Sequence, residues 1–180
     1  MIFDPRGHLE SLGRLRRRTL LASLAVAALA RRVKAQGVPT DTLAVLEAAA
    51  SRILPSDDGP GAKEAKVGRF IDRQLQELPA IRPAFEQLAR FLDLWARKVF
   101  SKPFASLEAR DQDVILGQLA RGQIPVRGFP QEALFRGLHT LTLEGFLSDP
   151  VHGGNDGEIG WRSIGCPAPH LRRPGGRHGR

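Results

Sequence analysis

Apolar residues recur at steps of three and four positions along most of this 180-residue chain. That spacing puts them on one side of an α-helix, whereas a half-buried strand would alternate at every second residue. No segment sustains the alternation of a strand. Five stripes with the helical spacing follow one another, at Leu43–Leu54, Val67–Leu78, Ile81–Val99, Ser106–Leu119 and Gln131–Leu147. The sequence therefore predicts an all-α fold of about five helices.

Proline, glycine and small polar residues mark where these helices should begin and end. Pro39-Thr40-Asp41 is a helix-start pattern, and Pro55 should stop the first helix. Ser106 is expected to cap the fourth helix, which should end at Gly122. In the last helix we expect an inward face made of Leu134, Leu138, Leu141 and Phe146.

The stretch from residue 145 to residue 165 breaks this helical pattern with glycines, at positions 145, 153, 154, 157, 160 and 165. Glycine allows a positive φ or a close approach of two backbones. The stretch is not a polar linker, because apolar side chains stand among the glycines: Phe146, Leu147, Val151, Ile159, Trp161 and Ile164. Such a composition indicates an ordered, irregular segment that packs against something. The alternative is a run of surface turns that closes the helical domain.

The positive charge of the chain lies at its two ends. The formal net charge is +8, yet residues 36–170 hold 15 basic and 17 acidic residues. A nucleic-acid-binding domain concentrates positive charge on its folded surface. The distribution therefore argues against nucleic-acid binding and directs attention to the N-terminus.

The N-terminal end resembles an export signal. Arg17 and Arg18 precede an uncharged run of 12 residues from Thr19 to Ala30, which is too short to span a bilayer but suits a signal-peptide core. An arginine pair in this position resembles the twin-arginine signal. Cleavage could follow Ala30 or Ala35. The alternative is a buried or amphipathic N-terminal helix with basic flanks.

The motifs of cofactor chemistry are absent from the sequence. There is no dinucleotide-binding or phosphate-binding glycine loop, no haem-attachment motif and no cysteine set for an iron–sulfur cluster. Asp149, Asn155, Asp156 and Glu158 could offer oxygen ligands to a Ca²⁺-like ion, but their spacing does not match a calcium loop. We expect Asp149 and Asn155 to cap turns instead. A hydrolase triad of Ser148, His152 and Asp156 lacks a nucleophile elbow and is rejected.

Three blocks of the sequence resemble one known family. The most specific is SDPVHGGNDGEIGWRSIGCP with the preceding TLEGF, which is similar to the C-terminal signature of the gluconate 2-dehydrogenase subunit 3 family. Residues 53–75 and 100–119 resemble the other blocks of the family in the expected order, and the similarity covers about residues 40–167. His152 departs from the aromatic residue expected there, and the basic tail after Pro169 matches nothing in the family.

The resemblance implies a non-catalytic small subunit of a bacterial, membrane-bound, FAD-dependent sugar or polyol dehydrogenase. FAD would then lie on a large flavoprotein of the glucose–methanol–choline type, and haem c on a membrane-anchored cytochrome that takes the electrons. This chain would hold no cofactor and no catalytic residue. Twin-arginine transport carries folded proteins, so the signal of this chain would export the flavoprotein bound to it.

The interpretation divides the chain into a signal peptide at 1–35, a helical domain at 36–148, a Gly-rich partner-binding arm at 149–170 and a basic, disordered tail at 171–180. We expect the arm to lie on the flavoprotein through Asp149, Gly153, Gly154, Asn155, Gly160, Trp161 and Cys166. Trp161 would be the apolar anchor, since buried aromatics dominate interface energetics. Cys166 is the single cysteine, and would form an intersubunit disulfide, remain a thiol outside any disulfide, or be a buried apolar residue. The predicted location is periplasmic. The alternative function is a free-standing exported metal- or ligand-binding protein.

Overall fold

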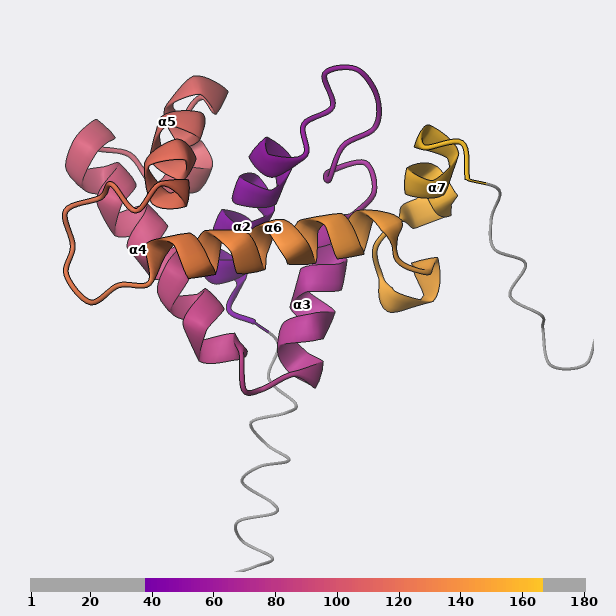
Figure 1. The fold of residues 1–180 in the computed structure, drawn as a ribbon, viewed down its shortest axis with the longest axis horizontal. Coiled ribbons are helices and arrows are strands. Elements are labelled where there is room, and N and C mark those ends of the chain that lie inside the picture. Colours follow the sequence, from indigo (N-terminus) through magenta and orange to yellow (C-terminus); the bar gives the residue numbers. More distant parts are fainter. Residues whose placement is uncertain (1–37, 167–180) are drawn as a thin grey trace, which may run out of the picture. The chain divides into compact units, whose positions relative to one another are not determined.

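The computed structural model describes residues 38–166; residues 1–37 and 167–180, which include the predicted export signal and the basic tail, lie outside the described part. Between residues 38 and 166 the chain forms α-helices and short 3₁₀ turns and no strand (Figure 1). The helices are α2 (Thr40–Ile53), α3 (Val67–Glu77), α4 (Arg82–Phe100), α5 (Ala109–Ala120), α6 (Gln131–Leu147) and α7 (Ile159–Ser163). The 3₁₀ turns are η1 (Phe104–Ser106), η2 (Pro150–His152) and η3 (Asp156–Glu158). The predicted all-α class is confirmed.

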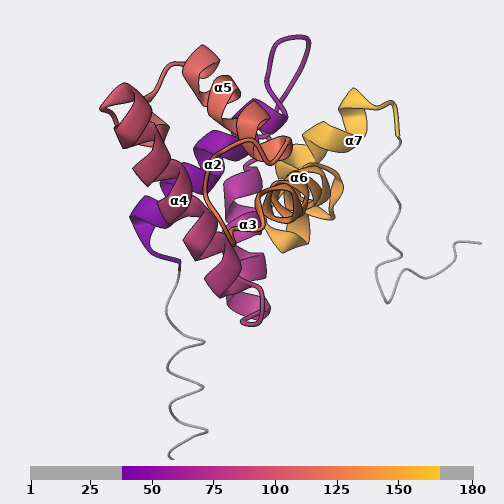
Figure 2. The same cartoon turned by 60° about the vertical axis from the view of Figure 1, so that its left-hand side comes forward.

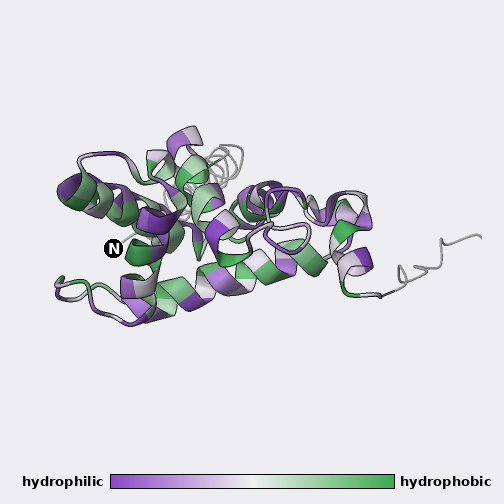
Figure 3. Ribbon diagram, turned by 90° about the horizontal axis from the view of Figure 1, so that it is seen from above, coloured by the Kyte–Doolittle hydropathy of each residue, from purple (hydrophilic) through white to green (hydrophobic). Residues whose placement is uncertain are grey.

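Helices α2 and α6 hold the helical body together. Each of them packs against α3, α4 and α5, and they also contact each other (Figures 1 and 2). Hydrophilic and hydrophobic residues share most helices, as their amphipathic spacing requires (Figure 3). The apolar sides meet in one core, in which Leu88, Leu92 and Leu138 are fully buried.

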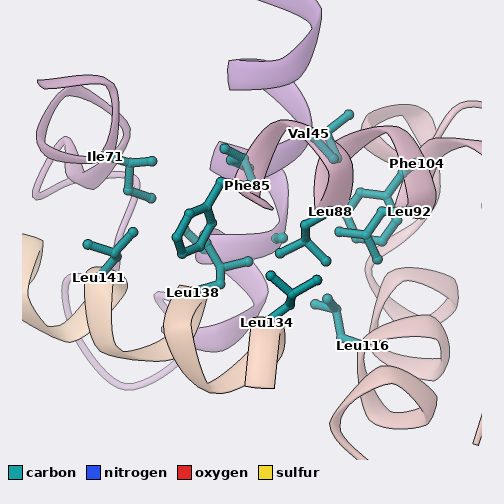
Figure 4. Packing of buried hydrophobic residues seen from close by; sticks show 14 of the residues in the cluster. Val45, Ile71, Phe85, Leu88, Leu92, Phe104, Leu116, Leu134, Leu138 and Leu141 are labelled. Atoms are coloured by element: carbon teal, nitrogen blue, oxygen red, sulfur yellow. The ribbon is translucent and has the colours of Figure 1, made fainter. Parts of the chain in front are cut away.

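The inward face predicted for the last helix is correct. Leu134, Leu138 and Leu141 point from α6 towards the side chains of α3 and α4 (Figure 4). These three residues and Phe146 are all buried. Burying a leucine side chain stabilises a fold by roughly 1.5–3 kcal/mol, so this face fixes α6 firmly against the body.

A buried glutamine at the start of α6 holds the chain that leads into the helix. The Gln131 side chain is 7% exposed, and its Oε1 accepts from the Ile124 N–H at 3.0 Å while its Nε2 donates to the Ile124 carbonyl at 2.7 Å. Both polar atoms of a buried amide are thereby satisfied. Nearby, the ring of Phe129 stacks on Phe91 of α4 with centroids 4.1 Å apart. These contacts tie the connection between α5 and α6 to the body.

Two details of the predicted helices are wrong. Helix α5 begins at Ala109 with Glu108 as its N-cap, so Ser106 does not cap it but ends η1. The cause is Phe104, which is fully buried and is held by Gln112 Nε2 on its carbonyl and by Asp93 Oδ1 on its N–H. Leu78 and Val99, at the ends of two predicted apolar stripes, are 47% and 51% exposed, and Leu78 is the C-cap of α3 and lies outside that helix.

Candidate functional site

The chain after α6 folds back onto the end of that helix. We call residues 148–166 the C-terminal segment; it contains η2, η3 and α7, and α7 contacts α6 (Figure 1). The sequence predicted an ordered, irregular arm that lies on the flavoprotein, with a run of turns that closes the helical domain as the alternative. The structure shows short helical turns that pack on the body of the same chain, and the contact with the flavoprotein stays a prediction.

Asn155 ties the two ends of the C-terminal segment together. Its side chain is 0% exposed; Nδ2 donates to the Ser148 carbonyl at 2.8 Å, and Oδ1 accepts from the Gly160 N–H at 2.7 Å. Its backbone adopts φ 47°, in the left-handed region that asparagine tolerates better than most residues. An amide has both the donor and the acceptor that this position requires, so the structure explains why asparagine stands here.

Trp161 anchors α7 on the end of α6. The residue is 8% exposed, and its indole N–H donates to the Leu147 carbonyl at 2.7 Å. That carbonyl lies in the last turn of α6, where helical carbonyls have no partner within the helix. Trp161 is therefore an apolar anchor, as the sequence indicated, but the surface that receives it belongs to this chain.

Two glycines allow the backbone of the C-terminal segment to touch the backbone of α6, and a third lets α6 lie close to α3. A Cβ added at Gly154 would lie 2.0 Å from the Gly145 carbonyl oxygen, and one at Gly160 would lie 1.9 Å from the Phe146 carbonyl oxygen. A Cβ at Gly145 itself would press on Phe70 and Val67 of α3, each at 3.0 Å. The predicted backbone-to-backbone approach thus occurs within the chain.

Contacts to α3 hold the other side of the C-terminal segment. The Asp156 N–H donates to the Ala65 carbonyl at 3.2 Å, and the Asp156 carboxylate pairs with Lys66. The hydrogen bond from Lys66, and next the positive charges of Lys66 and Arg69, lower the pKa of Asp156. Arg73 of α3 donates to the Val151 carbonyl. Lys66 and Arg73 lie in the block 53–75 that resembles the family, but no sequence pattern indicated their partners.

Two acidic residues of the C-terminal segment have structural roles: Asp149 caps a turn and Asp156 forms an ion pair. Asp149 Oδ1 accepts from the Val151 N–H at 2.9 Å and caps η2, which confirms the predicted turn-capping role. Gly153 adopts φ 101°, a conformation that favours glycine. Within residues 38–166 no group of three or more His, Cys, Asp or Glu side chains is placed to hold a metal ion. A Ca²⁺ site at Asp149, Asn155, Asp156 and Glu158 therefore has no support in the described part of the chain.

Two of the shallow grooves on the described surface lie beside α2. One, of about 210 Å³, lies between α2 and the start of α3, with Glu47, Lys63, Lys66 and Arg69 around it. The other, of about 530 Å³, runs between α2 and α4 beside η1 and includes the exposed Leu94. None of the helices described is long and apolar enough to cross a membrane.

The remaining predicted site residues fall in two places. Cys166 is exposed at the end of the described part, so the alternative of a buried apolar cysteine is wrong. Arg17 and Arg18 lie outside the described residues. The structure thus brings together Gly154, Asn155, Gly160 and Trp161 at the end of α6, and leaves the partner contact of the predicted interface residues as a prediction.

Comparison with known proteins gives one match. The family model described as gluconate 2-dehydrogenase subunit 3 matches residues 40–167, from the first residue of α2 to just beyond the C-terminal segment. Comparison with curated proteins and with solved structures gave no significant match. The family is named for an accessory subunit of a dehydrogenase complex. Because the match covers most of the sequence and confirms the resemblance seen in it, the chain belongs to the gluconate 2-dehydrogenase subunit 3 family.

Proposed function

We propose that this chain is the non-catalytic small subunit of a periplasmic, FAD-dependent sugar or polyol dehydrogenase. Its role is to help the catalytic flavoprotein fold, to stabilise it and to take it through the twin-arginine pathway. The observation that carries the proposal is the family match over residues 40–167. The sequence adds the export pattern, an arginine pair at Arg17 and Arg18 before a short apolar run.

The chemistry would reside on the partner subunits. FAD would lie on a flavoprotein of the glucose–methanol–choline type, which would also supply the catalytic base and determine the substrate. A cytochrome subunit with haem c, anchored in the inner membrane, would receive the electrons and would place the complex at the periplasmic face. This division agrees with a sequence in which no cofactor-binding motif occurs.

The structure changes the role that we propose for the central residues of the interface predicted from the sequence. Asn155 and Trp161 are buried within this chain, so they would shape the C-terminal segment and not touch the flavoprotein directly. Asp149 would do the same through its turn. Of the predicted interface residues, the exposed Cys166 would be the one to meet the partner, in an intersubunit disulfide.

Export of the flavoprotein tests the proposal. The double variant Arg17→Lys/Arg18→Lys should leave both this chain and its flavoprotein partner in the cytoplasm, measured by immunoblots of periplasmic and cytoplasmic fractions. Arg31→Lys/Arg32→Lys is the matched control, because it makes the same conservative change in an arginine pair after the apolar run. That control should export both proteins normally. Wild-type levels of periplasmic flavoprotein with the first variant would refute the export role.

A further inference from the structure

Helix α6 carries a line of apolar and aromatic side chains that begins beside the core, at Phe135, and leads to the exposed side of the helix. Phe135, His139, Leu143 and Leu147 follow one another at four-residue steps, which places each one turn from the next. Phe135 is half-buried with its ring centroid 6.3 Å from that of His139, while Leu143 and Leu147 are 38% and 40% exposed. We call these four residues the outer stripe.

The outer stripe gains a further apolar residue from the C-terminal segment. Ile164 is 61% exposed and follows α7 directly. Because Trp161 of α7 donates its indole N–H to the Leu147 carbonyl, α7 lies at the same end of α6 as the exposed Leu147. The docked segment therefore holds Ile164 near the end of the outer stripe. The function of the buried contacts of Asn155 and Trp161 would then be to fix the position of the exposed Ile164.

The charges around the outer stripe indicate what kind of surface it meets. The charged residues of α6 are Glu132, Arg136 and Glu144, and the first two approach each other to 3.8 Å. Helices that lie on membranes carry an excess of Lys and Arg for anionic lipids, which α6 lacks. A core poor in charge with a polar rim of both signs is typical of a protein–protein interface. The family is named as one subunit among others, so the partner that fits is a different subunit and not a second copy.

We infer that the outer stripe of α6, together with Ile164, is the surface on which the catalytic flavoprotein docks. The inference rests on the proposed function. It places the interface on exposed residues of α6 and on Ile164, and not on the buried residues of the C-terminal segment. Leu143 and Leu147 would lie at the centre of the contact. Arg136 and Glu144 would lie at its rim and help to fix the register of the two subunits.

Recovery of the flavoprotein with affinity-tagged, full-length chain tests this surface. The variant Leu143→Gln/Leu147→Gln keeps good helix formers at two exposed positions, so α6 should persist. It should recover at least tenfold less flavoprotein than wild type while its circular dichroism and thermal midpoint stay the same. Leu94→Gln is the matched control, since Leu94 is a 68% exposed leucine of α4, and its recovery should equal wild type.

The possible outcomes separate the two hypotheses. If the wild-type chain recovers no flavoprotein, the proposed function fails. If wild type and the double variant recover it equally, the docking surface is wrong while the function stands. Loss of a wild-type dimer in size-exclusion chromatography, with flavoprotein recovery unchanged, would assign the stripe to self-association and would also overturn the inference. Ile164→Gln, which lies outside every helix, should lower recovery too and replaces the double variant if that unfolds.

Discussion

At the scale of single residues, Asn155 shows how the C-terminal segment keeps its conformation. A fully buried side chain must have its polar atoms bonded, and here the two bonds join Ser148 at one end of the C-terminal segment to Gly160 near the other. The residue also occupies the left-handed region, which costs a residue other than Gly, Asn or Asp about 1 kcal/mol or more. Few substitutions satisfy both demands.

We therefore expect Asn155→Ala to lower the free energy of unfolding by about 3 kcal/mol, because it leaves a buried donor and a buried acceptor without partners. Urea denaturation of the full-length chain, followed by circular dichroism, measures this loss. Asp149→Ala is the control, since it also removes a side-chain bond of the segment, but in an exposed turn. It should cost less than about 1 kcal/mol. Equal costs for the two variants would contradict the role assigned to Asn155.

Part of this site could be predicted from the sequence. The turn-capping role of Asp149 follows from residue type and from its place before Pro150. The burial of Trp161 also follows, because a lone tryptophan among glycines rarely stays exposed. The surface on which Trp161 packs could not be predicted, because a sequence pattern indicates that an aromatic residue is buried but not which residues cover it. Lys66 and Arg73 were missed because their partners are a carboxylate 90 residues away and a backbone carbonyl.

At the scale of elements, the fold depends on how closely the C-terminal segment approaches α6. The closest approach is at Gly160, whose Cα lies against the Phe146 carbonyl, so that even a methyl group would overlap it. The contact places α7, and with it Trp161, on the last turn of α6. Glycine is thus required at this position by space, since no positive φ occurs there.

Gly160→Ala should accordingly destabilise the chain by about 3 kcal/mol, the upper part of the range for overpacking, because the clash is with backbone that cannot rotate away. Gly59→Ala provides the comparison, because a Cβ at Gly59 has no atom within 4 Å. Thermal unfolding should show a clear drop in midpoint for the first variant and none for the second. A Gly160→Ala chain as stable as Gly59→Ala would show that α7 does not dock as described.

The long helices were predictable because their apolar spacing repeats over many residues. The bounds of α6 follow from Pro130 before it and from the stripe that ends at Leu147. The start of α5 could not be predicted in the same way. It depends on contacts of the buried Phe104 with other parts of the chain, and not on the capping tendency of Ser106. The docking of the C-terminal segment could not be predicted either. Glycines permit two backbones to approach closely, but their positions do not indicate which part of the protein they approach.

At the scale of the whole molecule, the charge pattern and the family match lead to the same function. The positive charge belongs to the two ends of the chain, and the residues between them are nearly neutral. That arrangement agrees with the proposed division into a helical body and a predicted N-terminal export signal. The outer stripe of α6 supplies an exposed surface of the kind such a body needs.

The central claim is that this chain is a subunit whose cofactor chemistry lies on a partner. Its most direct test is the visible absorbance of the chain purified alone, compared with that of the chain co-purified with the proposed flavoprotein partner. We predict no visible band and no sugar oxidation for the chain alone. The complex should show flavin absorbance and dehydrogenase activity, and the flavin should stay with the flavoprotein when the subunits are separated. A yellow or haem-red preparation of the isolated chain would contradict the claim.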